Sequence, residues 1–322
     1  MENILLMDTS VATLNKGDEI IMRCVKSELD FLLKDKFVLN LPTHLSPFHS
    51  YQIWRNSRRV QYYKNCRFKF VCGTNLLVPN MLTHFPQWNL NIFNYGAVKD
   101  CILVGVGKGA GDKTNIYTTK LYQNLLNHEY IHSARDERTK DYLESMGLKA
   151  LNTGCVTMWM LTPEFCKTIP TQKARNVVFT LTYRAKPDER DQQLIDILNE
   201  NYENVYFWVQ GVDDYSYLHN FKNIEKINIV PATVDAYENV LNMDDIDYVG
   251  TRLHAGVFAM RHAKRAVIIA IDERAREINK CNNLNCIEKD EISKLPEILN
   301  GEIKTNIIMP FEKIEKWKAQ FK

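Results

Sequence analysis

The sequence lacks the features that mark several common classes of protein. No apolar run among its 322 residues is as long as a membrane-spanning helix. Its first residues, MENILLMDTS, contain no basic region, which argues against a secretory signal peptide. With a net charge of +2, the whole chain has no basic excess that would favour nucleic acid. We therefore expect a cytoplasmic protein with no transmembrane segment and no nucleic-acid partner.

The eight cysteines lack the spacing of a zinc site, and a disulfide scaffold would be unusual in a chain of this length. Residues 128–132 read HEYIH and match the H-E-x-x-H zinc motif, which requires one continuous helix. Residues 130–134 instead have the pattern of a short strand, so the chain should bend after residue 129. We predict no bound metal and no cofactor. Four cysteines lie within apolar runs, as reduced buried thiols do: Cys24, Cys72, Cys101 and Cys155.

Alternating strand and helix patterns run through both halves of the sequence, which is typical of parallel α/β sheets. In the first half they predict strands at 4–7, 68–72, 100–106 and 130–134, with helices at 18–33 and 139–146. In the second half they predict strands at 176–182, 205–209, 228–230, 247–249 and 266–271, with helices at 191–198, 237–241 and 255–262. The segment 162–174 contains two prolines and little apolar periodicity, which indicates a linker.

These patterns predict an α/β protein of two Rossmann-like domains facing a cleft, an architecture of the glycosyltransferase-B type. The N-terminal domain spans residues 1–165 and the C-terminal domain spans residues 175–309. Residues 310–322 predict an amphipathic helix that packs back on the N-terminal domain. Residues 45–69 are rich in aromatic and basic side chains, and we interpret them as a solvated connection, with sugar binding as the alternative.

The stretch from Tyr248 to Glu277, YVGTRLHAGVFAMRHAKRAVIIAIDERARE, is the most informative about function. Arg252 and His254 follow a predicted strand and precede a predicted helix, where backbone N–H groups and the helix dipole favour anions. Arginine can hold a carboxylate or phosphate with two hydrogen bonds, and histidine can supply a proton near neutral pH. In an extended loop both side chains would lie on one side, with Leu253 pointing into the core. Purely structural roles for both residues are the alternative.

This stretch resembles the C-terminal signature of the polysaccharide pyruvyltransferase family, an Arg-x-His loop followed by an Ala-rich helix, a buried strand and an Asp. The family's Gly-rich turn near residue 73 is replaced here by Gly-Thr-Asn. Other segments agree with the family in order: LNKGDEIIM at 14–22, FVCGTNLL at 70–77, ILVGVGKG at 102–109, SARDERTKDYLESMG at 133–147 and TGCVTMWML at 153–161.

The resemblance implies an enzyme that transfers the enolpyruvyl group of phosphoenolpyruvate to two hydroxyls of a sugar and forms a pyruvate ketal. Because this donor carries a carboxylate and a phosphate, at least two cationic side chains should hold it. We expect these to be Arg252 and Arg135, with Arg184 as a third candidate. His254 could donate the proton or hold the phosphate, and His84 could deprotonate the acceptor hydroxyl.

The expected partners are phosphoenolpyruvate and a saccharide or lipid-linked sugar acceptor used in polysaccharide biosynthesis. Peripheral membrane association and the oligomeric state stay open. A nucleotide-sugar glycosyltransferase of the same architecture and a non-catalytic carbohydrate-binding protein are the alternatives. The glycine-rich run 105–111 matches no Walker A motif, and we interpret it as a flexible loop beside the cleft. The remaining substrate contacts are expected at strand ends and turns: Asn15, Gly17, Asp18, Thr74, Asn75 and Gly107.

Overall fold

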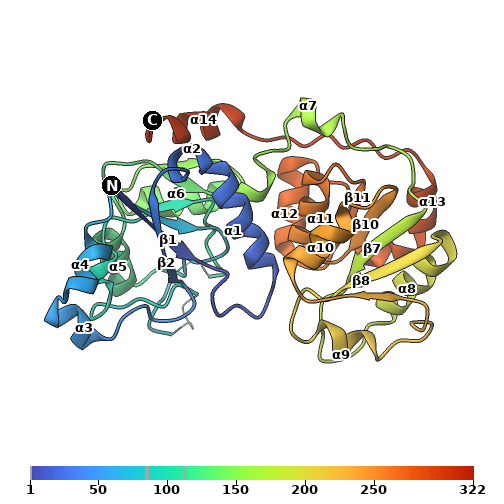
Figure 1. Ribbon diagram of the computed structural model, residues 1–322, viewed down its shortest axis with the longest axis horizontal. Coiled ribbons are helices and arrows are strands. Elements are labelled where there is room, and N and C mark those ends of the chain that lie inside the picture. The colour runs from blue at the N-terminus through green and yellow to red at the C-terminus, as the bar shows by residue number, and fades with distance from the viewer. Residues whose placement is uncertain (1, 84–86, 112) are drawn as a thin grey trace. The chain divides into compact units, whose positions relative to one another are not determined.

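The chain forms two compact units, each built on parallel β-strands (Figure 1). The structure is a computed structural model that describes residues 2–83, 87–111 and 113–322. The first unit comprises Met1–Thr13, Ile21–Trp159 and Pro310–Lys322, and the second comprises Leu14–Ile20 and Met160–Met309. The predicted α/β class is confirmed. In the described part of the chain, no helix combines the length and the apolar character needed to span a membrane.

The first unit is organised around a parallel sheet with the strand order β2-β1-β3-β4, and β5 and β6 form a separate parallel pair. Its strands are β1 (Asn3–Asp8), β2 (Phe37–Pro42), β3 (Phe68–Cys72), β4 (Ile102–Val104), β5 (His132–Ala134) and β6 (Ala150–Asn152). Its helical segments are α1 (Gly17–Glu28, which begins in the second unit), α2 (Asp30–Leu33), α3 (Ser50–Arg55), α4 (Arg58–Lys64), η1 (Tyr95–Ala97), α5 (Ile116–Leu125), α6 (Glu137–Ser145), η2 (Val156–Met158) and α14 (Phe311–Ala319).

Side chains of β5 accept hydrogen bonds from backbone N–H groups in and just after β4. The backbone N–H of Leu103 donates to Nδ1 of His132 over 3.2 Å, and the N–H of Gly105 donates to Oγ of Ser133 over 2.7 Å. The second ring nitrogen of His132 lies 2.9 Å from the carbonyl oxygen of Asn127. Because the imidazole is fully buried, its neutral form with Nδ1 as acceptor is the form that fits these contacts.

Helix α14 closes the first unit with a cluster of aromatic rings. Trp317 is fully buried, and its ring centroid lies 6.2 Å from that of Phe70 and 5.6 Å from that of Trp159. Phe321, just after α14, also packs against Phe70 of β3, with 5.2 Å between the ring centroids. Burying an aromatic side chain of this size contributes about 2 kcal/mol or more, so the C-terminal segment is an integral part of the first core.

The second unit contains a six-stranded, entirely parallel sheet with the order β12-β11-β10-β7-β8-β9. The chain builds β7, β8 and β9 outward in one direction and then places β10 on the other side of β7, so the order reverses between β7 and β10. Its strands are β7 (Asn176–Thr180), β8 (Asn204–Trp208), β9 (Asn228–Val230), β10 (Ile246–Gly250), β11 (Ala266–Ala270) and β12 (Cys286–Glu288). Its helical segments are α7 (Pro163–Cys166), α8 (Glu189–Asn201), α9 (Asp214–Leu218), α10 (Val234–Leu241), α11 (Leu253–Arg261), α12 (Glu273–Asn282), η3 (Lys289–Lys294) and α13 (Leu295–Asn300).

At two places the local structure differs from what the sequence indicated. Residues 45–69, interpreted as a solvated connection, are largely exposed but contain two helices that were not predicted, α3 and α4; the buried Val60 anchors α4, and Ser57 caps it by accepting from the Val60 N–H. Residues 252–254 are not an extended loop, because α11 already begins at Leu253. His254 therefore lies in the first helical turn, and alternation along a strand does not determine its direction.

The bend predicted within the H-E-x-x-H sequence is confirmed. Residues 128–131 lie outside any helix, and β5 begins at His132. The His128 ring is used locally, with Nε2 at 2.7 Å from the carbonyl oxygen of Gln123. Among the described residues, no group of three or more His, Cys, Asp or Glu side chains could hold a metal ion. The two histidines thus lack the shared helical face that this zinc motif requires.

Burial of His132 makes the stability of the first unit depend on pH. Burial lowers the pKa of His132 to about 4, below the ordinary histidine value of 6.5. The unfolded chain then binds this proton more readily, so the stabilisation is present above about pH 6.5 and is lost as the pH falls toward 4. We expect His132 to remove about 2 kcal/mol of unfolding free energy between neutral pH and about pH 5.

Urea denaturation of the wild-type protein and a His132→Gln variant at several pH values measures this contribution. The variant should lose stability less steeply on acidification than the wild type. His128→Gln, at an exposed histidine nearby, should keep the wild-type slope. Equal slopes for His132→Gln and the wild type would contradict this account.

Candidate functional site

The main candidate site lies at the carboxyl ends of β7 and β10, where the strand order of the second sheet reverses. Open α/β sheets bind ligands at such switch points. The backbone N–H of Thr251 donates to the carbonyl oxygen of Thr180 over 3.1 Å, and the hydroxyls of Thr182 and Thr251 lie 2.9 Å apart. Tyr248 donates its hydroxyl to the carbonyl oxygen of Arg252 over 2.9 Å. These contacts continue the strand pairing into the loops and place Arg252 at the carboxyl ends of the central strands.

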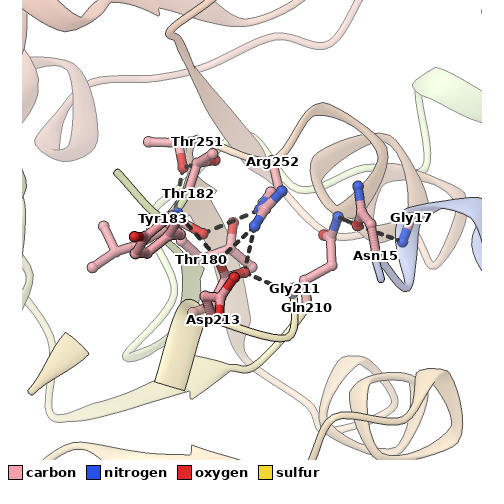
Figure 2. A network of polar contacts seen from close by, with 12 residues as sticks. Asn15, Gly17, Thr180, Thr182, Tyr183, Gln210, Gly211, Asp213, Thr251 and Arg252 are labelled. Atoms are coloured by element: carbon pink, nitrogen blue, oxygen red, sulfur yellow. Dashed lines mark hydrogen bonds and ion pairs between the residues drawn. The ribbon is translucent and has the colours of Figure 1, made fainter. Parts of the chain in front are cut away.

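Three hydrogen bonds hold the guanidinium of Arg252 (Figure 2). Nε donates to the carbonyl oxygen of Leu181 over 3.1 Å, and Nη2 donates to both carboxylate oxygens of Asp214, one at 2.7 Å. The Asp214 side chain is 1% exposed and that of Arg252 is 16% exposed. Within the described part of the chain Nη1 has no hydrogen-bond partner, so the guanidinium is fixed in place with one nitrogen available to an anion.

The Asp214 carboxylate is itself held by backbone groups. It accepts from the N–H of Gly211 over 2.7 Å and from the N–H of Tyr183 over 3.2 Å. Glycine is favoured at position 211, because an added Cβ would lie 2.5 Å from Nη2 of Arg252, which the bonds to Asp214 and Leu181 hold in place. The loop after β8 thus supplies both the counter-charge for Arg252 and the space that its guanidinium occupies.

Residues before and at the start of α1 complete this cluster. Oδ1 of Asn15 accepts from the N–H of Gly17 over 2.9 Å and from Nε2 of Gln210 over 2.7 Å (Figure 2). A Cβ on Gly17 would lie 3.0 Å from Nε2 of Gln210 and 3.4 Å from Nδ1 of His254, so the bare glycine brings the backbone close to both side chains. Oε1 of Gln210 is buried and has no partner in the described part of the chain. A ligand that donates a hydrogen bond could satisfy this atom.

A second candidate cluster lies in the first unit, on three successive loops that leave β3, β4 and β5. The N–H of Gly107 donates to the carbonyl oxygen of Thr74 over 2.8 Å, and the N–H of Arg135 donates to that of Val106 over 3.0 Å. A Cβ on Gly107 would lie 2.6 Å from both Cζ of Arg135 and Oδ1 of Asn75. The backbone bonds therefore bring an arginine and an amide together around a glycine.

Each polar side chain of this cluster has one unsatisfied atom. Nη1 of Arg135 and Oδ1 of Asn75 are buried and lack hydrogen-bond partners among the described residues. The Arg135 side chain is 7% exposed, and its ion pair with Asp136 is long, at 3.4 Å. That carboxylate is also committed to capping α6, since Oδ1 accepts from the N–H of Thr139 over 2.7 Å. Unsatisfied buried polar atoms are costly, so this cluster has the character of a binding site.

The backbone before Asn75 adopts a conformation that few residues tolerate. Gly73 has a φ of 57° and Thr74 has a φ of 49°. A left-handed conformation is strained for a β-branched residue such as threonine, and strain of this kind gathers at functional sites. A Cβ at position 73 would lie 2.1 Å from Cγ2 of Ile21, so only glycine fits there. The paired left-handed residues turn the chain so that Asn75 reaches Gly107.

The predicted site residues therefore fall into two groups and a remainder. One group gathers in the second unit and the other in the first. Arg184 is exposed in the loop between β7 and α8, and none of the hydrogen bonds that hold Arg252 involves it; Asp18 lies in the first turn of α1. His84 lies outside the described residues. The second-unit group is Asn15, Gly17, Arg252 and His254, and the first-unit group is Thr74, Asn75, Gly107 and Arg135.

Sequence reasoning missed three residues of the second-unit cluster, namely Gln210, Gly211 and Asp214. A signal was present, since QGVDD directly follows the predicted strand 205–209. Polar residues and a glycine at the end of a buried parallel strand indicate a ligand-facing loop. The pairing of Asp214 with Arg252, 38 residues away, was not visible in the sequence.

Comparison with known proteins assigns the chain to a family. A sequence model described as polysaccharide pyruvyl transferase matches residues 15–273, which include both clusters. The chain belongs to the polysaccharide pyruvyl transferase family. Among curated proteins, none matches the sequence.

Solved structures show that this pyruvyl transferase family member has the glycosyltransferase-B-like fold expected from its sequence. The UDP-GlcNAc 2-epimerase of Methanocaldococcus jannaschii, in complex with UDP-GlcNAc and UDP, is 11% identical with a TM-score of 0.52, covering 99% of each chain. MnaA of S. aureus, in complex with UDP, is 10% identical with a TM-score of 0.53, covering 100% of this chain and 98% of that one. At this level of identity the likeness concerns the fold alone.

The ion pair between Arg252 and Asp214 should be essential for the stability of the second unit. Asp214→Asn would leave the guanidinium charge without its buried partner, which we expect to cost about 3 kcal/mol of unfolding free energy. The neighbouring Asp213 is exposed and makes no side-chain cap to α9. Asp213→Asn removes the same charge at a surface position and should change stability by less than about 0.5 kcal/mol. Urea denaturation at neutral pH distinguishes the two variants, and equal stability would refute the role given to Asp214.

Proposed function

We propose that this protein transfers the enolpyruvyl group of phosphoenolpyruvate to two hydroxyls of a sugar in a cell-surface polysaccharide or its precursor. C2 of the donor forms bonds to both sugar oxygens and loses its bond to the phosphate ester oxygen. C3 gains a proton as C2 becomes electrophilic. Of the two hydroxyl protons, one balances the proton taken up at C3 and the other leaves with inorganic phosphate. The product is a cyclic pyruvate ketal.

One observation carries this proposal: two arginines, one in each unit and each just after the carboxyl end of a strand, have a guanidinium nitrogen without a partner in the described chain. Nη1 of Arg252 and Nη1 of Arg135 are these atoms. Phosphoenolpyruvate carries a carboxylate and a phosphate, and a guanidinium can bind either group with directed, charge-assisted hydrogen bonds. Preorganised donors of this kind stabilise charge that develops as the phosphate leaves.

His254 is the proposed proton donor or phosphate ligand. It lies in the first turn of α11, largely buried, with Nδ1 near the position that a Cβ on Gly17 would occupy. The backbone at a helix N-terminus favours an anion, which suits a phosphate ligand. An imidazole near a reacting carbon suits proton transfer to C3. The unsatisfied Oε1 of Gln210 is the proposed acceptor of a hydrogen bond from a hydroxyl of the acceptor sugar.

Incubation with phosphoenolpyruvate and a panel of p-nitrophenyl hexosides tests the proposal. Mass spectrometry should detect a pyruvate ketal on one hexoside, with release of one inorganic phosphate per ketal. Calorimetric titration with phosphoenolpyruvate and with UDP separates the alternatives. Binding of UDP without binding of phosphoenolpyruvate would favour nucleotide-sugar glycosyl transfer and contradict the proposal. Binding of hexosides alone would favour a carbohydrate-binding protein.

Substitutions at the two ends of α11 distinguish a role in catalysis from a role in the stability of the fold. Arg252→Lys keeps the charge but loses the planar fork, and we expect kcat/KM to fall at least about tenfold, or about 1.4 kcal/mol. His254→Ala should lower kcat more than donor affinity if the imidazole transfers the proton, and the reverse if it holds phosphate. Arg261→Lys and His262→Ala, at the other end of the same helix, are the matched controls. Full activity in folded Arg252→Ala and His254→Ala proteins would remove this cluster from the mechanism.

A pair of glycines tests the first-unit cluster. Gly107→Ala places a Cβ at 2.6 Å from Cζ of Arg135 and from Oδ1 of Asn75, whereas a Cβ on Gly109 has no atom nearer than 3.6 Å. Both clashing atoms are ends of flexible side chains, so Gly107→Ala should displace them at a cost below about 1 kcal/mol. We expect its affinity for phosphoenolpyruvate to fall at least about tenfold, while Gly109→Ala stays near wild type. Equal affinities, measured by calorimetry, would exclude Arg135 as a donor ligand.

A further inference from the structure

Charge is strongly segregated along this chain. Residues 36–99 contain none of its 39 Asp and Glu residues but eight of its 41 Lys and Arg residues. This segment covers β2, α3, α4, β3 and η1 of the first unit. A long stretch without a single carboxylate, in a chain whose charges otherwise nearly balance, indicates a partner that carries negative charge.

The basic side chains of α3 and α4 are not neutralised within the protein. Arg55, Arg58 and Arg59 are exposed and, among the described residues, make no ion pair. Two other basic residues of the segment, Lys36 and Arg67, both pair with the carboxylate of the preceding Glu2. The three arginines of α3 and α4 therefore present their charge to the surroundings.

Exposed aromatic and aliphatic side chains accompany these arginines. The exposed fraction is 85% for Trp54, 66% for Phe93, 59% for Tyr51 and 52% for Ile92. The four residues line one shallow depression of about 440 Å³ together with Ser50 and Ile53. Large apolar side chains exposed together are uncommon in proteins that have no partner at that surface.

A second depression lies between α4 and the edge strand β2. It has a volume of about 340 Å³ and is lined by Phe37 and Leu39 of β2 together with Arg59, Tyr62 and Tyr63 of α4, and by Asn3. Phe37 and Tyr62 are themselves exposed. Figure 1 shows α3 and α4 in lighter blue within the first unit. We call the surface formed by both depressions and the three arginines the aromatic-basic surface.

We propose that the aromatic-basic surface binds the protein peripherally to an anionic lipid membrane. Tryptophan and tyrosine favour the headgroup region of a bilayer, where one part of the ring is in apolar surroundings and another is hydrated. Arginines bind lipid phosphates and add an electrostatic attraction that increases with the fraction of anionic lipid. The surface combines both requirements for reversible binding, apolar insertion and basic charge, without a spanning helix. This inference uses residues other than those of the proposed transfer chemistry and does not depend on it.

Vesicle sedimentation with the full chain tests the proposal. The protein should sediment with vesicles of equal parts phosphatidylcholine and phosphatidylglycerol, sediment far less with phosphatidylcholine alone, and dissociate as salt is raised. The Arg55→Gln, Arg58→Gln, Arg59→Gln triple variant should bind at least about tenfold more weakly. Trp54→Ala with Phe93→Ala should weaken binding at least about fivefold, because apolar insertion is lost.

Matched substitutions in the second unit provide the control. Lys222→Gln, Lys226→Gln and Lys304→Gln remove three exposed positive charges, and Tyr215→Ala removes an exposed aromatic ring; both should leave binding unchanged. Thermal melting of every variant shows that it is folded. The proposal is overturned if the wild type does not bind anionic vesicles, or if the α3–α4 and control variants bind equally.

A soluble polyanion distinguishes a glycan from a membrane. If dextran sulfate binds at this surface while anionic vesicles do not, the partner is an acidic polysaccharide and the membrane proposal is wrong. Affinity for phosphoenolpyruvate, measured on the same variants, should be that of the wild type. Loss of vesicle binding with intact donor affinity thus separates this inference from the proposed function.

Discussion

The buried ion pair between Arg252 and Asp214 organises the candidate site of the second unit. A guanidinium is costly to bury. Its position at the carboxyl end of β10 becomes fixed only when a carboxylate and a carbonyl oxygen accept hydrogen bonds from its N–H groups. Asp214 can take this role because the loop after β8 turns at Gly211, whose backbone N–H holds the carboxylate while its missing side chain leaves room for the guanidinium. The outcome is a preorganised cation with one nitrogen still available.

The two arginine clusters differ in how far the protein satisfies the guanidinium. Arg252 has a full counter-charge, so its protein environment is nearly neutral and its geometry is fixed before any ligand arrives. Arg135 has only a long contact to a carboxylate that caps α6, and both it and Asn75 retain unsatisfied buried atoms. The first arrangement supplies orientation, and the second supplies a stronger attraction for an anion because a ligand would complete unmade hydrogen bonds.

Charge in this protein is placed by region more than by total amount. The nearly balanced totals conceal an acid-free segment in the first unit, whereas the second unit pairs much of its charge internally, as in the buried contact between Arg265 and Asp247. Arg265 and Asp247 neutralise each other inside the chain, whereas unpaired exposed arginines beside aromatic rings can contact something outside it. A net charge close to zero therefore says little about the surfaces that a protein offers to partners.

Patterns local to the chain determined a large part of this structure. Residues 68–72 form β3 as predicted, and the strands and helices around Arg252 follow their periodicity, because burial of alternating or helically spaced apolar side chains is decided within a few residues. The order of several short motifs was sufficient to indicate the family. The helices within residues 45–69 were missed because their polar and basic composition resembles that of a solvated loop, and the single buried face that stabilises α4 is too short to stand out.

What the local patterns could not determine are contacts between distant segments. Asn15 receives its hydrogen bond from Gln210, 195 residues later in the chain, and Arg252 meets Asp214 only because β7, β8 and β10 end at one edge of the sheet. Side chains at strand ends become neighbours through the order of the strands, which periodicity does not encode. The sequence therefore determined which residues are available for chemistry, and only the tertiary structure decided which of them are paired, which are left unsatisfied and which face the solvent.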